Sequence, residues 1–287
     1  MATNKWQGTT TNPATAGNWS GGVPTANDDV NLPDAADFAV AGGDLATGVT
    51  ISTLSVDYGF GQTIGSKSAY LQFDVGGTTK TVVLNNNTAT YLDIDTATLI
   101  TVNRAAVGST TEKGLSLVGA SNTELDIKTS TGSIGLASGA GETFACTTIN
   151  IYGGKVEIGS GVTCENLNIF GGMVTNYTTI ATCTMHGGVL DDRKGCTTLN
   201  PYGGKYIWSH TVDITTMGTI KGATIDLSSE ETVVTVTNKI IIAQGTINDP
   251  YGRLADGLII TPDNADITDD GVKIKLGKGR KITLGTA

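Results

Sequence analysis

The sequence predicts an all-β protein, a parallel β-helix (β-solenoid) whose coils take about 17 residues each. Three observations predict it: a composition typical of strands and tight turns, an apolar–polar alternation, and a repeat that ends in two glycines. The chain of 287 residues contains 39 glycines and 6 prolines, and only 16% of its residues are charged. Such a composition favours short strands joined by turns over long surface helices. Because no segment keeps a helical apolar period, we expect strands nearly throughout.

Four segments carry the repeat, and they read INIYGG, LNIFGG, CTMHGG and LNPYGG. The first glycines of their pairs are Gly153, Gly171, Gly187 and Gly203, at spacings of 18, 16 and 16 residues. Apolar positions lie four and two residues before this glycine and three residues after it, with polar residues between them. This alternation predicts strands with one buried face. The glycine pair predicts a corner of the coil, where a positive φ or close packing excludes a Cβ atom.

A further column of the repeat lies seven residues before the glycine and consists of Cys146, Cys164, Ile180 and Cys196. Since isoleucine replaces cysteine there, we expect these thiols to be reduced, buried and apolar in character. A zinc site is the competing interpretation, but the sequence has no CxxC pair, and its two histidines fall in other columns. We therefore expect neither a metal nor another cofactor.

Strand-like segments continue on both sides of the repeat and predict three regions. Residues 1–40 are expected to form an N-terminal cap or attachment segment, residues 41–247 the β-helix, and residues 248–287 a small C-terminal β element or tail. The hand is expected to be right-handed, as is usual for parallel β-helices of this coil length. Because a solenoid leaves strand edges open at its ends, the terminal segments are expected to act as caps.

One column of the repeat carries rings at positions that alternate outward. It stands directly before the first glycine and consists of Tyr152, Phe170, His186 and Tyr202. Rings stacked on an outer face can form a seam between solenoids packed side by side, because apolar stripes mark interfaces. They can also bind a sugar, or form an ordinary ladder that a loop covers. The sequence leaves these three interpretations open.

The densest charge cluster of the repeat is the stretch LDDRKG, which contains Asp191 and Asp192. In its column Asp191 has its nearest acidic neighbour two coils away, about 10 Å at the spacing of stacked strands. This separation is too wide for a retaining glycosidase pair and at or beyond the limit for an inverting pair. We expect a solvated turn here. No other catalytic motif is present, so the sequence predicts no catalytic residues and no enzyme.

The charge balance argues against some partners. The net charge of −9 disfavours nucleic acid, whose phosphates require a basic face. The first residues, MATNKWQG, show no secretory signal, and no apolar stretch is long enough to cross a membrane. We expect a chain that is made and folded in a cytoplasm.

The N-terminal stretch KWQGTTTNPATAGNWSGGVPTANDDVNLP combines a tryptophan and glycine with N-W-x-x-G-x-x-P and D-D-V. The segment GVTISTLSVDYGFGQTIG follows at residues 48–65. Together, over roughly residues 5–65, they resemble the opening of β-helical structural proteins from tailed-bacteriophage particles, of the capsid-decoration or head-fibre type. The motif also fits a cap on physical grounds. Its tryptophan rings can cover the open end of the apolar core, its proline restricts the backbone before the first strand, and its carboxylates can accept backbone N–H groups. The expected cap residues are Trp6, Trp19, Pro24, Asp28 and Asp29.

The resemblance implies a structural virion protein, made in the host cytoplasm, that decorates or stabilises a phage capsid. Its implied partner is the major capsid protein or another virion protein, and we expect a homotrimer. The alternative is a tail spike or receptor-binding protein that binds or cleaves host polysaccharide on the same scaffold. The content of 3 Trp, 8 Tyr and 5 Phe is low for a glycan binder and favours decoration.

Overall fold

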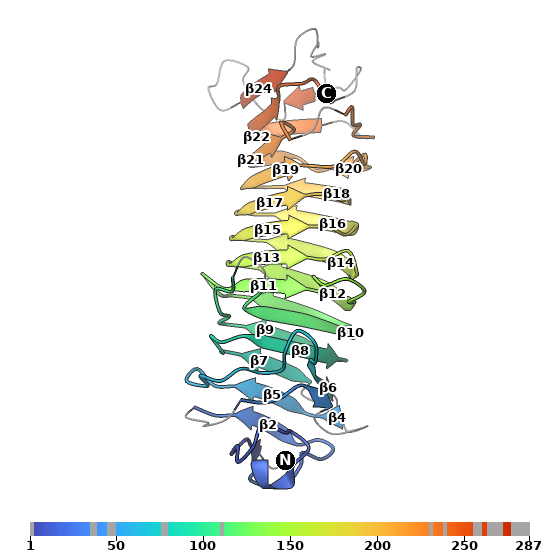
Figure 1. The fold of residues 1–287 in the computed structure, drawn as a ribbon. Helices are drawn as coiled ribbons and strands as arrows, with labels where there is room; N and C mark the ends of the chain where they lie inside the picture. The colour runs from blue at the N-terminus through green and yellow to red at the C-terminus, as the bar shows by residue number, and fades with distance from the viewer. Residues whose placement is uncertain are drawn as a thin grey trace. The chain divides into compact units, whose positions relative to one another are not determined.

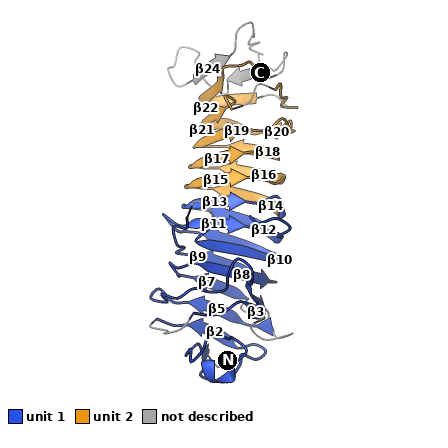
Figure 2. Ribbon diagram, in the orientation of Figure 1, with its two compact units in different colours: residues 1–163 blue, residues 164–287 orange. Residues whose placement is uncertain are grey.

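The structure, a computed structural model, describes residues 3–34, 39–44, 50–75, 80–109, 112–229, 232–237, 240–254, 260–262 and 272–276, the last two ranges by their backbone. The chain divides into two compact units, residues 1–163 and residues 164–287, coloured separately in Figure 2. Each unit is considered by itself below.

The described residues form a parallel β-solenoid, as predicted, and make about ten turns of about 21 residues (Figure 1). No α-helix occurs in this part of the chain, where the only helical element is the 3₁₀ turn η1 at Ala16–Asn18. Accordingly, the described residues include no helix that could span a bilayer. Small polar residues and glycine-rich turns explain this, because each coil needs short strands and sharp corners rather than long helices.

The first unit contains two parallel sheets. Along one sheet run β1 (Thr3–Lys5), β2 (Asp29–Leu32), β5 (Thr53–Val56), β7 (Thr81–Leu84), β9 (Leu99–Val102), part of β10 (Leu115–Ile127) and β12 (Phe144–Ile151). Along the other run β3 (Gly43–Asp44) and β4 (Thr50–Ile51), both beside β6 (Leu71–Val75), then β8 (Thr90–Asp95), β10, β11 (Ser133–Leu136) and β13 (Lys155–Ile158). Strand β10 belongs to both sheets because its register shifts between Gly119 and Asn122, where the strand passes the corner.

The second unit has the same construction. One sheet contains β14 (Val162–Ile169), β16 (Ile180–Met185), β18 (Cys196–Pro201) and β20 (Thr216–Met217). The other contains β15 (Met173–Asn176), β17 (Val189–Asp192), β19 (Lys205–Trp208), β21 (Ile220–Asp226) and β22 (Ile240–Asp249), with β23 (Ile260–Pro262) and β24 (Val272–Leu276) beside β22. All these pairings are parallel, as a solenoid requires.

Outside the repeat, the coils are longer than the predicted 17 residues. In the second unit Leu167 pairs with Cys183 and Cys183 with Leu199, so these coils take 16 residues. In the first unit Thr53 pairs with Thr81, a coil of 28 residues. The strands keep similar lengths in both places, so the additional residues lie in the connections. Insertions in surface connections add little to the cost of chain closure, and the strand columns alone do not reveal them.

The core lies between the sheets and contains the predicted apolar columns. Ile149, Leu167, Cys183 and Leu199 are at most 1% exposed. The cysteine column is also inside: Cys146, Cys164 and Cys196 are buried, and Ile180 pairs in register with Cys196. Burial first, then the nearby Asp192 carboxylate, raises the pKa of the Cys196 thiol, so the protonated form predominates at neutral pH. This environment fits the expected apolar role.

The glycine pairs form corners, as predicted. The second glycine of the repeat has a positive φ, for example 71° at Gly188 and 76° at Gly204. The first glycine lies against the backbone of the preceding coil, since a Cβ on Gly187 would stand 2.5 Å from the Phe170 carbonyl oxygen. Only glycine satisfies both requirements without strain.

Replacing Gly187 by alanine is therefore expected to lower the free energy of unfolding by about 1–3 kcal/mol, because the added methyl group must displace a backbone carbonyl. The midpoint of guanidinium unfolding measures this loss. The matched control is Gly17→Ala, since a Cβ there meets nothing within 4 Å and the φ is not positive. Equal midpoints for the two variants would contradict the close approach at the corner.

Candidate functional sites

The residues expected to form the N-terminal cap include a compact cluster around two tryptophans. Trp6 follows β1 and forms an antiparallel bridge with Trp19. Their rings pack edge to face at 4.9 Å, and the residues are 1% and 3% exposed. The Trp19 indole Nε1–H donates to the Pro13 carbonyl at 2.8 Å, so its polar atom is satisfied inside the cluster. Figure 1 places this segment at the N-terminal end of the strand stack of the first unit.

Asn18 fixes the loop that carries these rings. Its side-chain oxygen accepts the backbone N–H groups of Thr9 and Thr10, each at 2.8 Å, and its Nδ2 donates to the Asn12 carbonyl at 2.7 Å. Asn18 is fully buried. This network explains the NW pair of the motif, because one amide replaces the hydrogen bonds that a regular strand would provide.

The remaining cap residues lie before and at the start of β2. Pro24 is buried, and Asp28 and Asp29 are partly exposed. The Asp28 carboxylate accepts the backbone N–H of Thr25 at 2.8 Å, and the Asp29 carboxylate accepts the Thr53 hydroxyl at 2.9 Å. The two carboxylates thus fix the turn before β2 and join β2 to β5.

The column of rings is an exposed ladder in the second unit. The Phe170 and His186 rings stack at 4.8 Å with an interplanar angle of 2°, and the His186 and Tyr202 rings lie 5.5 Å apart. Phe170 is 42% and Tyr202 38% exposed. The Lys221 amine lies 5.3 Å from the Tyr202 ring centroid. The 16-residue register therefore places three rings on one outer face. The fourth expected member, Tyr152, belongs to the first unit, where it follows β12 and is exposed.

The LDDRKG stretch is only partly the solvated turn that the sequence predicts. Asp191 points outward and pairs with Arg193 at 2.8 Å. Asp192, however, is 1% exposed, so the prediction is wrong for this residue. The strand alternation in β17 continues to its end, and Asp192 therefore points to the same side as the core residue Leu190.

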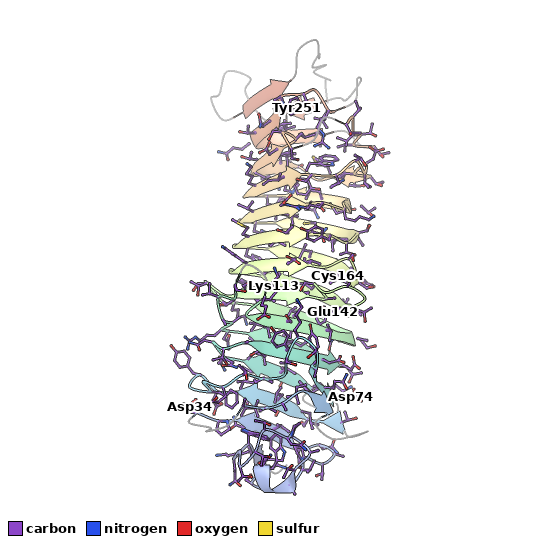
Figure 3. The ribbon with its side chains drawn as sticks, in the orientation of Figure 1. Asp34, Asp74, Lys113, Glu142, Cys164 and Tyr251 are labelled. Carbon is purple, nitrogen blue, oxygen red and sulfur yellow. The ribbon has the colours of Figure 1, made fainter. Side chains whose placement is uncertain are left out.

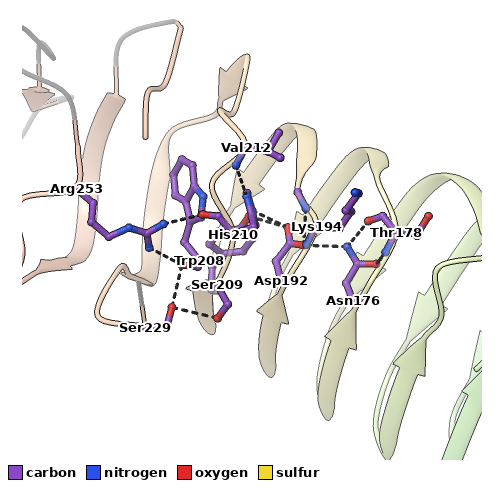
Figure 4. A network of polar contacts seen from close by, with 12 residues as sticks. Asn176, Thr178, Asp192, Lys194, Trp208, Ser209, His210, Val212, Ser229 and Arg253 are labelled. Atoms are coloured by element: carbon purple, nitrogen blue, oxygen red, sulfur yellow. Dashed lines mark hydrogen bonds and ion pairs between the residues drawn. The ribbon is translucent and has the colours of Figure 1, made fainter. Parts of the chain in front are cut away.

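Asp192 is the centre of a buried polar network in the second unit (Figure 4). Its carboxylate accepts the Tyr206 hydroxyl at 2.7 Å, the Gly195 N–H at 2.9 Å and the Asn176 amide at 2.9 Å, and it lies 3.6 Å from the His210 Nε2. Burial alone would raise the pKa of Asp192, but the His210 contact and the other donors lower it below its usual value. The ionised carboxylate is thus the form that the folded chain stabilises.

A buried arginine satisfies the carbonyl groups of the coil ends nearby. The Arg253 guanidinium donates to the carbonyl oxygens of Trp208 at 2.6 Å, His210 at 2.7 Å and Thr232 at 2.9 Å, and the residue is 0% exposed. These contacts join coils more than twenty residues apart in sequence. Because these acceptors are backbone carbonyl groups, Arg253 stabilises the irregular coil corners.

The Asp192 network predicts an acid-sensitive unit. A carboxylate whose folded pKa is depressed stabilises the fold fully above its unfolded pKa of about 3.9, and this stabilisation is lost as the pH falls towards the lower folded value. Asp226, which pairs with Lys205 at 2.7 Å, also has a lowered pKa and adds to the effect. We expect the unfolding midpoint to fall below about pH 4, and we expect Asp192→Asn to reduce this fall. Unfolding midpoints measured from pH 7 to pH 2 test this, and a slope that Asp192→Asn leaves unchanged would contradict it.

The first unit carries a groove that the sequence analysis does not anticipate. One part, of about 220 Å³, is lined by Lys67, Tyr70, Tyr91, Glu112, Lys113, Ser116, Ser138, Gly139, Glu142 and Glu157. A more open part, of about 520 Å³, shares Lys67, Tyr91 and Glu112 with it. Figure 3 labels Lys113 and Glu142 among the side chains of this unit. Most lining residues come from connections or from the second position of a strand, where no repeat pattern marks them, whereas Glu157 lies within β13 in the repeat column of Asp191.

Among the described residues, no group of three or more His, Cys, Asp and Glu side chains is arranged to hold a metal ion. Comparisons of the chain with protein-family models, curated proteins and solved structures find no match. The fold itself is that of a β-solenoid protein.

Proposed function

We propose that this chain is a structural virion protein of a tailed phage, which decorates or stabilises the capsid surface. The observation that supports it most is the N-terminal cap. Two of the residues on which the resemblance to phage β-helical proteins is based, Trp6 and Trp19, pack together and are buried. A solenoid with a closed first coil suits a mechanical role, because it presents a stable end and protects its strand edges.

The role would be mechanical. Binding that buries surface on folded capsid subunits stabilises them by mass action, so a decoration protein strengthens the shell without chemistry. The partner would be the major capsid protein or another virion protein.

The exposed ring ladder supports the second part of the proposal, a homotrimer. Phe170, His186 and Tyr202 present a regular strip, and a second copy of the chain is the occupant that we propose for it. Sedimentation equilibrium is expected to give three times the 29.4 kDa mass of the chain. Phe170→Ser together with Tyr202→Ser is expected to lower this mass, whereas Met173→Ser, which removes an apolar side chain outside the ladder that is 52% exposed, is not. A monomer before any substitution would exclude the trimer.

Antibody labelling of intact particles tests the virion role. Gold-labelled antibodies against the chain are expected to bind over the heads of particles from the source genome and to be absent from particles made without its gene. Label confined to the tails would overturn the capsid role and favour the alternative, a tail spike or receptor-binding protein. Absence of label on particles made in cells that express the chain would exclude a virion protein.

A further inference from the structure

We propose that the groove of the first unit binds a neutral oligosaccharide. This inference is independent of the capsid proposal, because a decoration protein and a tail spike can each carry such a site. We call the site the Tyr70–Tyr91 groove and define it by the residues that line its two parts, given above.

The shape of the groove suits a chain of sugar rings rather than a single small molecule. Its lining residues lie in or beside β6, β8, β10, β11 and β13, which are successive neighbours in one sheet. Neighbouring strands are about 4.8 Å apart, so the groove crosses several coils. The two parts together fall within the size range of ligand-binding clefts.

Two tyrosines line the site; Tyr70 is partly exposed, whereas Tyr91 is 6% exposed and supports it through ring contact. The Tyr70 and Tyr91 rings meet at 5.7 Å and 89°, so one ring presents its edge to the face of the other. Tyrosine has an apolar ring and a polar hydroxyl, and it holds both in place with few rotatable bonds. A sugar ring matches the exposed part of Tyr70, since it has an apolar C–H face and a rim of hydroxyl groups.

The polar groups of the groove are held in place before any ligand binds. The Glu142 carboxylate accepts the Tyr70 hydroxyl at 2.8 Å and the Gly139 N–H at 2.6 Å. Glu157 accepts the Lys113 amine at 2.7 Å. Burial, followed by the bond to Glu142, raises the pKa of Tyr70, so its hydroxyl remains a donor at neutral pH. Each carboxylate oxygen has a further lone pair that can accept a sugar hydroxyl, and such fixed acceptors reduce the entropy lost on binding.

The charges of the groove decide the class of sugar. Three glutamates and two lysines line its smaller part, and Lys113 is already paired with Glu157. An acidic polysaccharide would meet an excess of carboxylates, at a cost that grows as water is excluded. Ser116 and Ser138 add neutral donors and acceptors. The arrangement therefore favours uncharged hexose or N-acetylhexosamine units.

Titration calorimetry with the full chain tests the proposal, and the probes are maltotetraose, mannotetraose and chitotetraose, with a tetragalacturonate as the acidic comparison. At least one neutral probe is expected to bind with a Kd of millimolar or below. Glu142→Gln and Glu112→Gln are each expected to raise this Kd by about tenfold, because a lost hydrogen bond to a charged acceptor has about this effect. Lys67→Ala is expected to raise it less.

The controls are Glu165→Gln and Lys155→Ala, which change exposed residues outside the groove lining and are expected to leave the Kd unchanged. Because Lys67 and Glu112 are exposed, their variants remain folded even if Glu142→Gln does not. Three results would each overturn the proposal: no neutral probe binds at millimolar concentration, the groove variants bind as the unsubstituted chain does, or the tetragalacturonate binds more tightly than every neutral probe.

Discussion

Replacing Asp192 by alanine is expected to lower the free energy of unfolding by about 3–5 kcal/mol, the usual cost of removing one partner of a buried charged network. The substitution leaves the Tyr206 hydroxyl, the Gly195 N–H and the Asn176 amide without their shared acceptor. Each of these groups then carries an uncompensated desolvation cost. Guanidinium unfolding followed by circular dichroism measures the loss.

The adjacent residue provides the control for this prediction. Asp191→Ala removes a carboxylate from the other side of the same strand, where the Asp191 side chain is 22% exposed and its partner Arg193 is 49% exposed. Pairs of this kind contribute about 0–1 kcal/mol. If both variants lost the same stability, the buried network would not be what holds this part of the second unit together.

Replacing Trp6 by alanine is also expected to lower the free energy of unfolding by about 3–5 kcal/mol, because removal of a fully buried indole leaves a large cavity. The loss also removes the packing partner of Trp19 and opens the first coil. Since an open coil end exposes strand edges, the variant is expected to form larger species on size-exclusion chromatography. Thermal unfolding and the elution profile measure the two effects.

Tyr58→Ala is the matched aromatic control for the cap. Tyr58 is 70% exposed and its ring contacts Arg104 at 4.0 Å, so its removal is expected to cost about 1 kcal/mol or less. An unfolding midpoint of Trp6→Ala equal to that of Tyr58→Ala, with a monodisperse elution profile, would contradict a capping role for Trp6.

The repeat made the fold predictable because its constraints are local. Each glycine pair must turn the same corner, and columns such as Leu167, Cys183 and Leu199 must face the same core. The alternation of apolar and polar residues within each six-residue segment therefore predicted the strands, and the regular spacing of the glycine pairs predicted the solenoid. The coil length outside the repeat was not predictable, because connections such as the one between Thr53 and Thr81 carry no periodic signal.

The polar sites were less predictable, for two physical reasons. Asp192 occupies the column of Asn176 and Trp208, and an alternation followed to the end of β17 would have placed it inside, although its charge favoured solvent. The groove combines Tyr70, Tyr91 and Glu142 from three coils whose spacings differ. Only three-dimensional stacking brings them together. The structure therefore adds its largest new information at side chains whose partners come from other coils.

Cryo-electron microscopy of particles with and without the chain tests the proposed virion role most directly. Purified protein is added to capsids assembled from the source genome without its gene. The capsid role predicts added density at symmetry-related capsid sites, with a parallel β-solenoid recognisable in it. Capsids that remain bare while intact particles carry the same density at their tails would contradict it.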